Sequence, residues 1–170
     1  MQPYYWLLPV GALGLWWAMS NSNGASAGGG DPASGLDASQ LAILEKVRAA
    51  ARAIGVPEAL ALATCELESN FKDVKALKGA SYGPMQVHTS TLAAGETLAQ
   101  LQNIDWSIAR GCLILKQRLK LAKGDSELCR IMYFCGPGWQ KSCTEESLVR
   151  VRARWRPAAA KWGVQTRYPV

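Results

Sequence analysis

Residues 57–71, Pro-Glu-Ala-Leu-Ala-Leu-Ala-Thr-Cys-Glu-Leu-Glu-Ser-Asn-Phe, combine a helical apolar pattern with a carboxyl group at the end. Pro57 suits the start of a helix, because a residue in the first turn needs no N–H for intrahelical bonding. We therefore predict a helix from Pro57 to about Asn70. Its apolar stripe is formed by Leu60, Thr64, Leu67 and Phe71.

Glu68 borders this buried stripe. At about 100° of rotation per residue, it lies within about 60° of Thr64, Cys65 and Phe71, whereas Glu66 points away and is expected to pair with a basic residue. A carboxyl group beside apolar neighbours has a raised pKa and can stay protonated near neutral pH, as a general acid must. Glu68 is therefore the candidate catalytic acid.

Two further motifs follow in a fixed order. Gly83-Pro84-Met85-Gln86 is expected in a turn with a short extended segment, and Tyr133-Phe134-Cys135-Gly136-Pro137-Gly138 follows an expected helix. Together with Glu68-Ser69-Asn70-Phe71, they resemble the soluble lytic transglycosylase family over roughly residues 40 to 140. The chain departs from that family at Pro84, where Leu is usual, and at Phe134, where Asn is usual.

The resemblance implies a mainly α, goose-type lysozyme-like single domain that follows an N-terminal hydrophobic segment. It implies that Glu68 is catalytic and that Ser69, Met85, Gln86 and Tyr133 bind substrate. The Gln86 amide would bond sugar hydroxyls or acetamides, and Met85 would offer a soft apolar surface. Tyr133 would orient Glu68 or contact the glycan.

The expected activity follows from the single carboxylate. A hydrolysing glycosidase usually has two carboxylates, and only Glu68 lies in a recognisable motif. The family mechanism cleaves the MurNAc-β-1,4-GlcNAc bond of peptidoglycan and forms 1,6-anhydro-MurNAc, with no metal or cofactor. His88 is the single histidine, which excludes a multi-His metal site. A hydrolytic muramidase and a non-catalytic structural or ejection component are the alternatives.

The N-terminal segment, residues 1–20, is hydrophobic, and the first charged side chain is Asp31. Its apolar run is slightly shorter than a transmembrane span of about 20 residues. It is either a membrane anchor or a signal peptide, although the basic leading region of a signal peptide is absent. Residues 21–36 are rich in Gly, Ser and Ala and predict a flexible linker, so residues 37–170 form the expected domain.

Five cysteines in a chain of 170 residues suit an oxidising compartment such as the periplasm. Cys65 and Cys112 fall on apolar helix faces and are expected to pack as hydrophobic residues. Cys129, Cys135 and Cys143 lie close in sequence, which favours a local disulfide to Cys143. The expected location is the periplasm or cell envelope, either anchored in a membrane or carried in a virion.

The net charge is +6, and four arginines alternate with other residues from Arg150 to Arg156. Ser142 with Glu145 resembles a capping box, so we predict a helix up to Pro157 that spreads these arginines around its surface. Attraction to acidic stem peptides of peptidoglycan or to anionic lipid accounts for them. Peptidoglycan, a membrane and an envelope-spanning or virion assembly are thus the expected partners, and nucleic acid is disfavoured.

Overall fold

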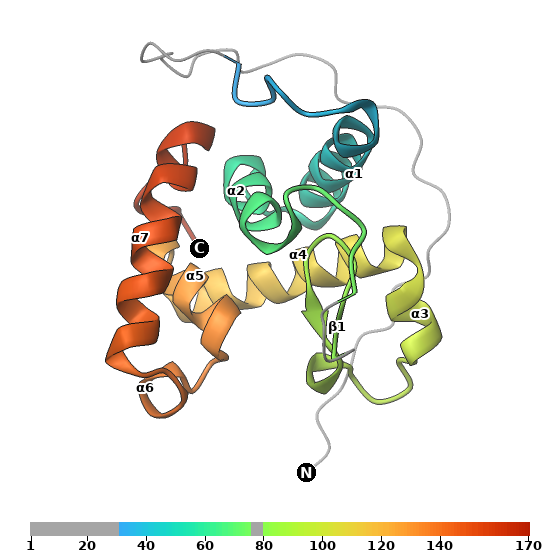
Figure 1. Cartoon of the computed structure of the whole chain (residues 1–170). Helices are drawn as coiled ribbons and strands as arrows, with labels where there is room; N and C mark the ends of the chain where they lie inside the picture. Colours follow the sequence, from blue (N-terminus) through green and yellow to red (C-terminus); the bar gives the residue numbers. More distant parts are fainter. Residues whose placement is uncertain (1–30, 76–79) are drawn as a thin grey trace.

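The computed structural model describes residues 31–75 and 80–170. This part of the chain is mainly helical, as predicted, with one short β-hairpin (Figure 1). In chain order its elements are α1 (Ala38–Ile54), α2 (Glu58–Ser69), β1 (Ser81–Tyr82), β2 (Val87–His88), the 3-10 turn η1 (Thr89–Thr91), α3 (Leu98–Gln102), α4 (Ile104–Leu121), α5 (Ser126–Cys135), α6 (Trp139–Ser142) and α7 (Glu145–Trp162).

Helix α1 begins with a capping box and ends at a glycine. The Asp37 side chain accepts from the Gln40 N–H, and the Gln40 side chain accepts from the Asp37 N–H, so two end donors are satisfied. Gly55 ends the helix in the left-handed conformation, with φ of 76°. Gln40 and Leu44 are buried on one face of the helix, whereas Leu41 is 40% exposed.

Helix α2 confirms the prediction from residues 57–71, since Pro57 precedes it and Ser69 is its last residue. The backbone then turns sharply, because Asn70 and Phe71 both adopt positive φ, 53° and 55°. Such angles are uncommon outside glycine and persist where the surroundings hold them. Gln40 Nε2 donates to the Asn70 carbonyl oxygen at 2.8 Å, which ties this turn to α1.

The hairpin is antiparallel, with Ser81 opposite His88 and Tyr82 opposite Val87. Its turn contains the Gly-Pro-Met-Gln motif. Gly83 has φ of 72°, and a Cβ added there would lie 2.2 Å from Ser107 Oγ in α4. A glycine is therefore required where the hairpin crosses α4.

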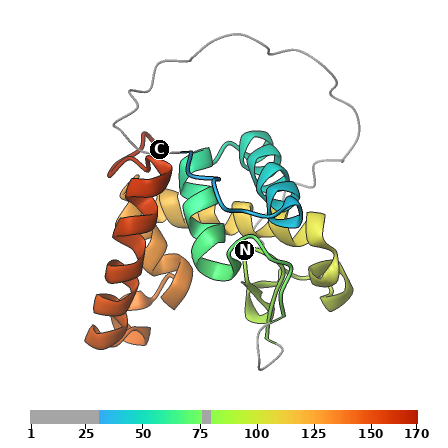
Figure 2. The same ribbon diagram turned by 45° about the horizontal axis from the view of Figure 1, so that its top comes forward.

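Helix α2 packs between α1 and α7, and α4 runs beneath them from the hairpin side of the molecule to α5 (Figures 1 and 2). This arrangement brings three segments far apart in sequence, the end of α2, the hairpin and the end of α5, to one side of α4. These are the segments that carry the three motifs.

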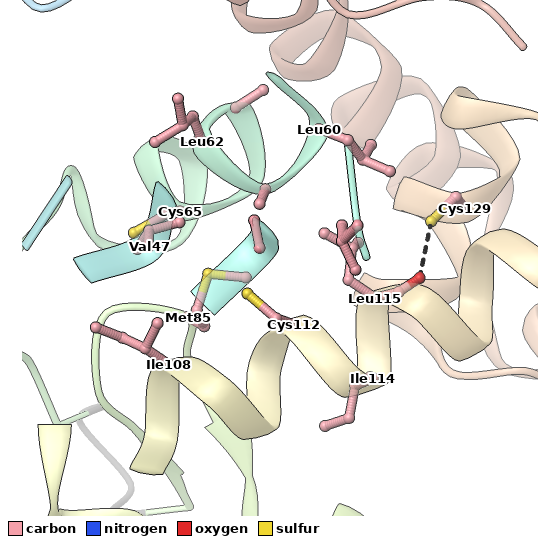
Figure 3. Close-up of a cluster of buried hydrophobic side chains, with 14 of the residues drawn as sticks. Val47, Leu60, Leu62, Cys65, Met85, Ile108, Cys112, Ile114, Leu115 and Cys129 are labelled. Atoms are coloured by element: carbon pink, nitrogen blue, oxygen red, sulfur yellow. Dashed lines mark hydrogen bonds between the residues drawn. The ribbon is translucent and has the colours of Figure 1, made fainter. Parts of the chain in front are cut away.

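The main core lies between α1, α2 and α4, and Figure 3 shows part of it. Leu60 and Cys65 of α2 and Cys112 and Leu115 of α4 are completely or almost completely buried. Ile114 points from α4 to the other side, away from Cys112 (Figure 3). A smaller cluster of Ile131, Leu148 and Val151 joins α5 to α7.

Helix α7 differs from the prediction at both ends. Thr144, and not Ser142, is its N-cap, because the Thr144 side chain accepts from the Ser147 N–H. The helix also continues beyond Pro157 to Trp162. Pro157 is exposed, whereas Trp155 and Trp162 are 2% and 8% exposed. Core packing on both sides of the proline therefore outweighs the missing N–H.

Cys135 and Cys143 form a disulfide with a Cα–Cα distance of 5.7 Å, which confirms the predicted local bridge to Cys143. It joins the end of α5 to the residue after α6. Cys65, Cys112 and Cys129 are free thiols and are fully buried, as expected of Cys65 and Cys112.

The expected hydrophobic segment, residues 1–20, lies outside the described residues, as does most of the expected linker. Ala33 and Leu36, at the end of that linker, pack against the core, so packing begins before residue 37. Within residues 31–75 and 80–170, no helix has both the length and the apolar character needed to cross a membrane.

Candidate functional site

A cleft of about 340 Å³ lies where the three motifs meet. The hairpin and η1 contribute one set of lining residues, from Ser81 to Thr91, and the end of α5 contributes Tyr133 to Gly136. Ile114 and Arg118 of α4 also line it, and Glu68 enters from the end of α2. Of the four expected site residues besides Glu68, two, Gln86 and Tyr133, are among the lining residues.

Glu68 is held by an arginine of α5. Arg130 Nη1 donates to Glu68 Oε1 at 2.5 Å, and the two side chains are only 5% and 17% exposed. A short, largely buried bond between two charged groups is among the stronger hydrogen bonds of a protein. Glu68 Oε2 has no hydrogen-bond partner within the described residues, so one carboxyl oxygen is anchored and the other is available.

This environment differs from the purely apolar one expected for Glu68. Partial burial disfavours the charge of a carboxyl group, whereas an adjacent guanidinium favours it. Glu68 therefore has a charged partner as well as apolar neighbours. Glu66 pairs with a basic residue as expected, since Lys161 Nζ lies 2.5 Å from its Oε1, and it also accepts from Trp162 Nε1 at 2.5 Å.

Glu68 is the single carboxyl side chain lining the described part of the cleft. The residues outside that description, 1–30 and 76–79, contain no Asp or Glu. Asp73, the nearest acid downstream, is exposed and does not line the cleft. Chemistry at this site would therefore rely on one carboxyl group.

Tyr133 bonds the hairpin and not Glu68. Its hydroxyl donates to the Met85 carbonyl oxygen at 2.7 Å. Burial, and then the neighbouring charge of Glu68, raise the pKa of Tyr133 well above its ordinary value, so the hydroxyl remains a donor at physiological pH. Tyr133 thus joins α5 to the hairpin, and Arg130 is the residue that orients Glu68.

Gln86 faces the cleft with its acceptor group. Its Nε2 donates to the carbonyl oxygens of Val74 and Gly83, at 2.8 and 2.9 Å, so both amide hydrogens are used in holding the turn. The side-chain oxygen remains as an acceptor. Gln86 also has φ of 49°, a strained backbone angle directly beside the cleft.

Ser69 and Met85 do not line the cleft, in contrast to the substrate-binding role expected for them. The Ser69 hydroxyl donates to the Pro84 carbonyl oxygen at 2.8 Å and accepts from the Lys72 N–H, so it fastens the end of α2 to the hairpin. The Met85 side chain is completely buried and lies beside Cys112 (Figure 3).

Two lining residues that the motifs did not single out for binding bring new chemistry. Phe134, where the family has Asn, is 56% exposed and presents an aromatic face. Arg118 is partly buried, and its Nε has no partner within the described residues. Desolvation lowers the pKa of Arg118, because the guanidinium loses water and few neighbouring groups stabilise its charge in return. Phe134 and Arg118 thus add a stacking surface and a cation.

The contacts of His88 and Trp139 are structural. His88 lines the rim of the cleft, where its Nδ1 accepts from the Ser90 N–H and caps η1. Trp139, the first residue of α6, packs against the core clusters and does not line the cleft.

Sequence reasoning missed Arg130, the partner of Glu68. A signal was present, because Arg130 is the one basic residue in α5 and stands three positions before Tyr133, on the same helix face. A lone arginine among apolar residues usually has a buried partner.

Comparisons of this chain with protein-family models, with curated proteins and with solved structures found no match.

Proposed function

We propose that the chain is a lytic transglycosylase of peptidoglycan with a lysozyme-like fold. The observation that carries the proposal is the single carboxyl group, Glu68, at the meeting point of three motifs around a cleft of about 340 Å³. The order of those motifs resembles the soluble lytic transglycosylases, and the cleft is lined mainly by polar and aromatic side chains suited to a glycan.

One carboxyl group is sufficient for this reaction, because the substrate supplies the nucleophile. Glu68 Oε2 gives its proton to the glycosidic oxygen as the bond from the muramoyl anomeric carbon to that oxygen breaks. The 6-hydroxyl oxygen of the same muramoyl unit bonds to the anomeric carbon. Its proton returns to Glu68, which is then ready for another cycle.

Arg130 fits a carboxyl group that must serve both as an acid and as a base. Its bond to Oε1 fixes the side-chain rotamer and leaves Oε2 directed at the substrate. The guanidinium stabilises the ionised carboxylate that exists between the two proton transfers. The pair therefore supports both the position of Oε2 and the carboxylate that takes back the proton.

The walls of the cleft offer groups for sugar recognition. The Gln86 side-chain oxygen can accept from a hydroxyl or an acetamide N–H, and Phe134 can pack against a pyranose face. Arg118 can donate to sugar or acetamide oxygens from α4. Phe134 replaces a polar Asn of the family, so binding in this chain would rely more on stacking and less on hydrogen bonding at that position.

The Cys135–Cys143 disulfide supports action outside the reducing cytosol, in the periplasm or cell envelope. Peptidoglycan lies in that compartment. We propose that the chain opens the cell wall locally for a phage or for an envelope-spanning machine, with residues 1–20 as its connection to a membrane.

The test is mass spectrometry of the fragments that residues 31–170 release from purified peptidoglycan, compared with the full chain and with Glu68→Gln. We expect anhydromuramoyl ends from the parent and none from Glu68→Gln, whose melting temperature should remain close to that of the parent. Reducing ends would replace the proposal with a hydrolytic muramidase. Absence of release from both folded proteins would point to a structural component of the envelope.

A further inference from the structure

A second hollow, of about 170 Å³, lies beside the cleft between α5 and α7. Arg130 and Phe134 line it from α5. Ser147, Arg150, Val151 and Arg154 line it from α7. Three of these six residues are arginines, and no acidic side chain lines this hollow within the described chain.

The positive charge of the hollow is weakly compensated. Arg130 is paired with Glu68. Arg150 has Glu146 at 3.6 Å, but the two side chains are 69% and 86% exposed, so water screens their attraction. Arg154 donates to the Leu67 carbonyl oxygen at 3.1 Å and makes no salt bridge with a described residue. Arg150 and Arg154 therefore retain donors for an anion.

The hollow and the cleft share one lining residue. Phe134 lines both spaces, and the Arg130 guanidinium carbon lies 6.0 Å from the centre of its ring. Glu68 and Arg130 form a pair that reaches from one space to the other. A group attached to a sugar in the cleft could thus extend across Phe134 into the hollow.

The other arginines of α7 serve a different contact. Arg152 Nε and Arg156 Nε both donate to the Glu127 carboxylate of α5, at 3.0 and 3.1 Å. The helix therefore presents two arginines that share the Glu127 carboxylate on one side and two arginines with available donors on the other. This arrangement divides the positive charge of α7 between two sides and does not form a continuous basic stripe of the kind that nucleic acid favours.

We propose that this hollow binds a carboxylate of the stem peptide attached to the muramoyl unit, so that the chain prefers glycan strands bearing peptides over bare strands. The inference rests on the proposed function. The stem peptide is attached to the lactyl group of the muramoyl unit and carries free carboxylates. Arginine matches a carboxylate in geometry and charge, and the Ser147 hydroxyl is a further donor.

The experiment compares two substrates that differ in the stem peptide, which an amidase replaces by the carboxylate of the lactyl group. One is peptidoglycan with intact stem peptides, and the other is the same glycan after an amidase has removed them. The kcat/KM for release of glycan fragments is measured on each for the parent chain, for Arg150→Gln, for Arg154→Gln and for the double variant. Arg152→Gln/Arg156→Gln is the matched control, because it removes the same charge from the same helix on the other side.

We expect the double variant to lose roughly tenfold more kcat/KM on peptide-bearing strands than on stripped strands, as the loss of charge-assisted hydrogen bonds implies. The control should retain the parent's ratio between the two substrates. An equal loss on both substrates would overturn the inference, because it would mean that the arginines act only on the fold or on the end of α2. An unchanged ratio in the double variant would overturn it as well.

A binding measurement separates this inference from the proposed function. Binding to both glycans, each immobilised on beads, is measured with Glu68→Gln and with Glu68→Gln carrying the two arginine changes. Stronger retention on peptide-bearing glycan that depends on Arg150 and Arg154 would support the hollow even if the parent released no fragments. Equal retention on the two glycans would reject the hollow even if the parent were a lytic transglycosylase.

Discussion

Arg130 and Glu68 are 62 residues apart in the chain, and their side chains form the one ion pair that reaches the described part of the cleft, at 2.5 Å. The pair joins the end of α2 to α5. It also places a charge in a region where the neighbouring residues Ile131 and Met132 are 2% and 8% exposed. Removal of either side chain would leave the other one without its partner in a poorly solvated position.

The first prediction concerns this pair. Arg130→Met should lower the free energy of unfolding by about 3 kcal/mol, because it leaves Glu68 partly buried without its cation. Glu68→Gln combined with Arg130→Met should be more stable than the sum of the two single changes implies. Urea denaturation of the four proteins measures this coupling.

A control at a second ion pair sharpens the comparison. Arg110→Met removes the partner of Glu96, a pair that lies outside the cleft with side chains 13% and 23% exposed. It should affect stability without any coupling to Glu68→Gln. If the changes at Arg130 and Glu68 were additive, the ion pair would not contribute in solution.

How far the sequence could predict the site is clear from α2. Helical spacing and the Pro57 start were sufficient to predict the helix and to place Glu68 at the edge of its buried face. Spacing within one helix gives no information on which residue of another helix will meet that edge. Arg130 could therefore be suspected from its apolar neighbours, but its partner depended on how α5 packs.

Met85 shows a second limit. Its motif position implied a surface for substrate, yet its side chain lies in the core and only its carbonyl oxygen takes part in the site. The direction depends on the positive φ of Gly83 and Gln86, and sequence pattern alone does not report φ at Gln86. In α1, the polar Gln40 is buried through its bond to Asn70, which is 30 residues away in the chain and which spacing within α1 cannot reveal.

The second prediction concerns Gly111, where α4 passes closest to the hairpin. A Cβ added there would lie 2.4 Å from Met85 Cβ and 3.2 Å from the Tyr133 hydroxyl oxygen. Gly→Ala in a helix ordinarily stabilises by up to about 1 kcal/mol. Here we expect the free energy of unfolding to fall by about 2 kcal/mol, because Met85 must move and overpacking costs more than the gain in helix propensity.

Thermal and urea unfolding measure the effect of Gly111→Ala. Gly138→Ala is the matched control, since an added Cβ there meets nothing within 4 Å and φ is −91°. A stabilising Gly111→Ala would contradict the close packing of α4 on Met85. The same variant should also weaken glycan release, because the Tyr133–Met85 bond lies at the wall of the cleft.

The last prediction concerns the three buried thiols. Burial raises the pKa of Cys112 and of Cys129 to about 12, from an ordinary 9.0, and it raises that of Cys65 still further. In the unfolded chain these thiols ionise near pH 9, whereas in the folded protein they remain protonated. The folded state therefore binds more protons above pH 9, and the free energy of unfolding must fall as pH rises.

Each thiol should contribute up to about 1.4 kcal/mol per pH unit to this fall between pH 9 and 12. Urea denaturation from pH 7 to 11 measures the slope, and Cys112→Ala should make it shallower at high pH while leaving it unchanged below pH 8. Iodoacetamide at pH 8 should label no thiol in the folded protein. It should label three after unfolding and five after unfolding with reduction, as the three free cysteines and one disulfide require. Rapid labelling of Cys112 in the folded protein would contradict its burial, and an identical slope in Cys112→Ala would show that other groups cause the alkaline loss of stability.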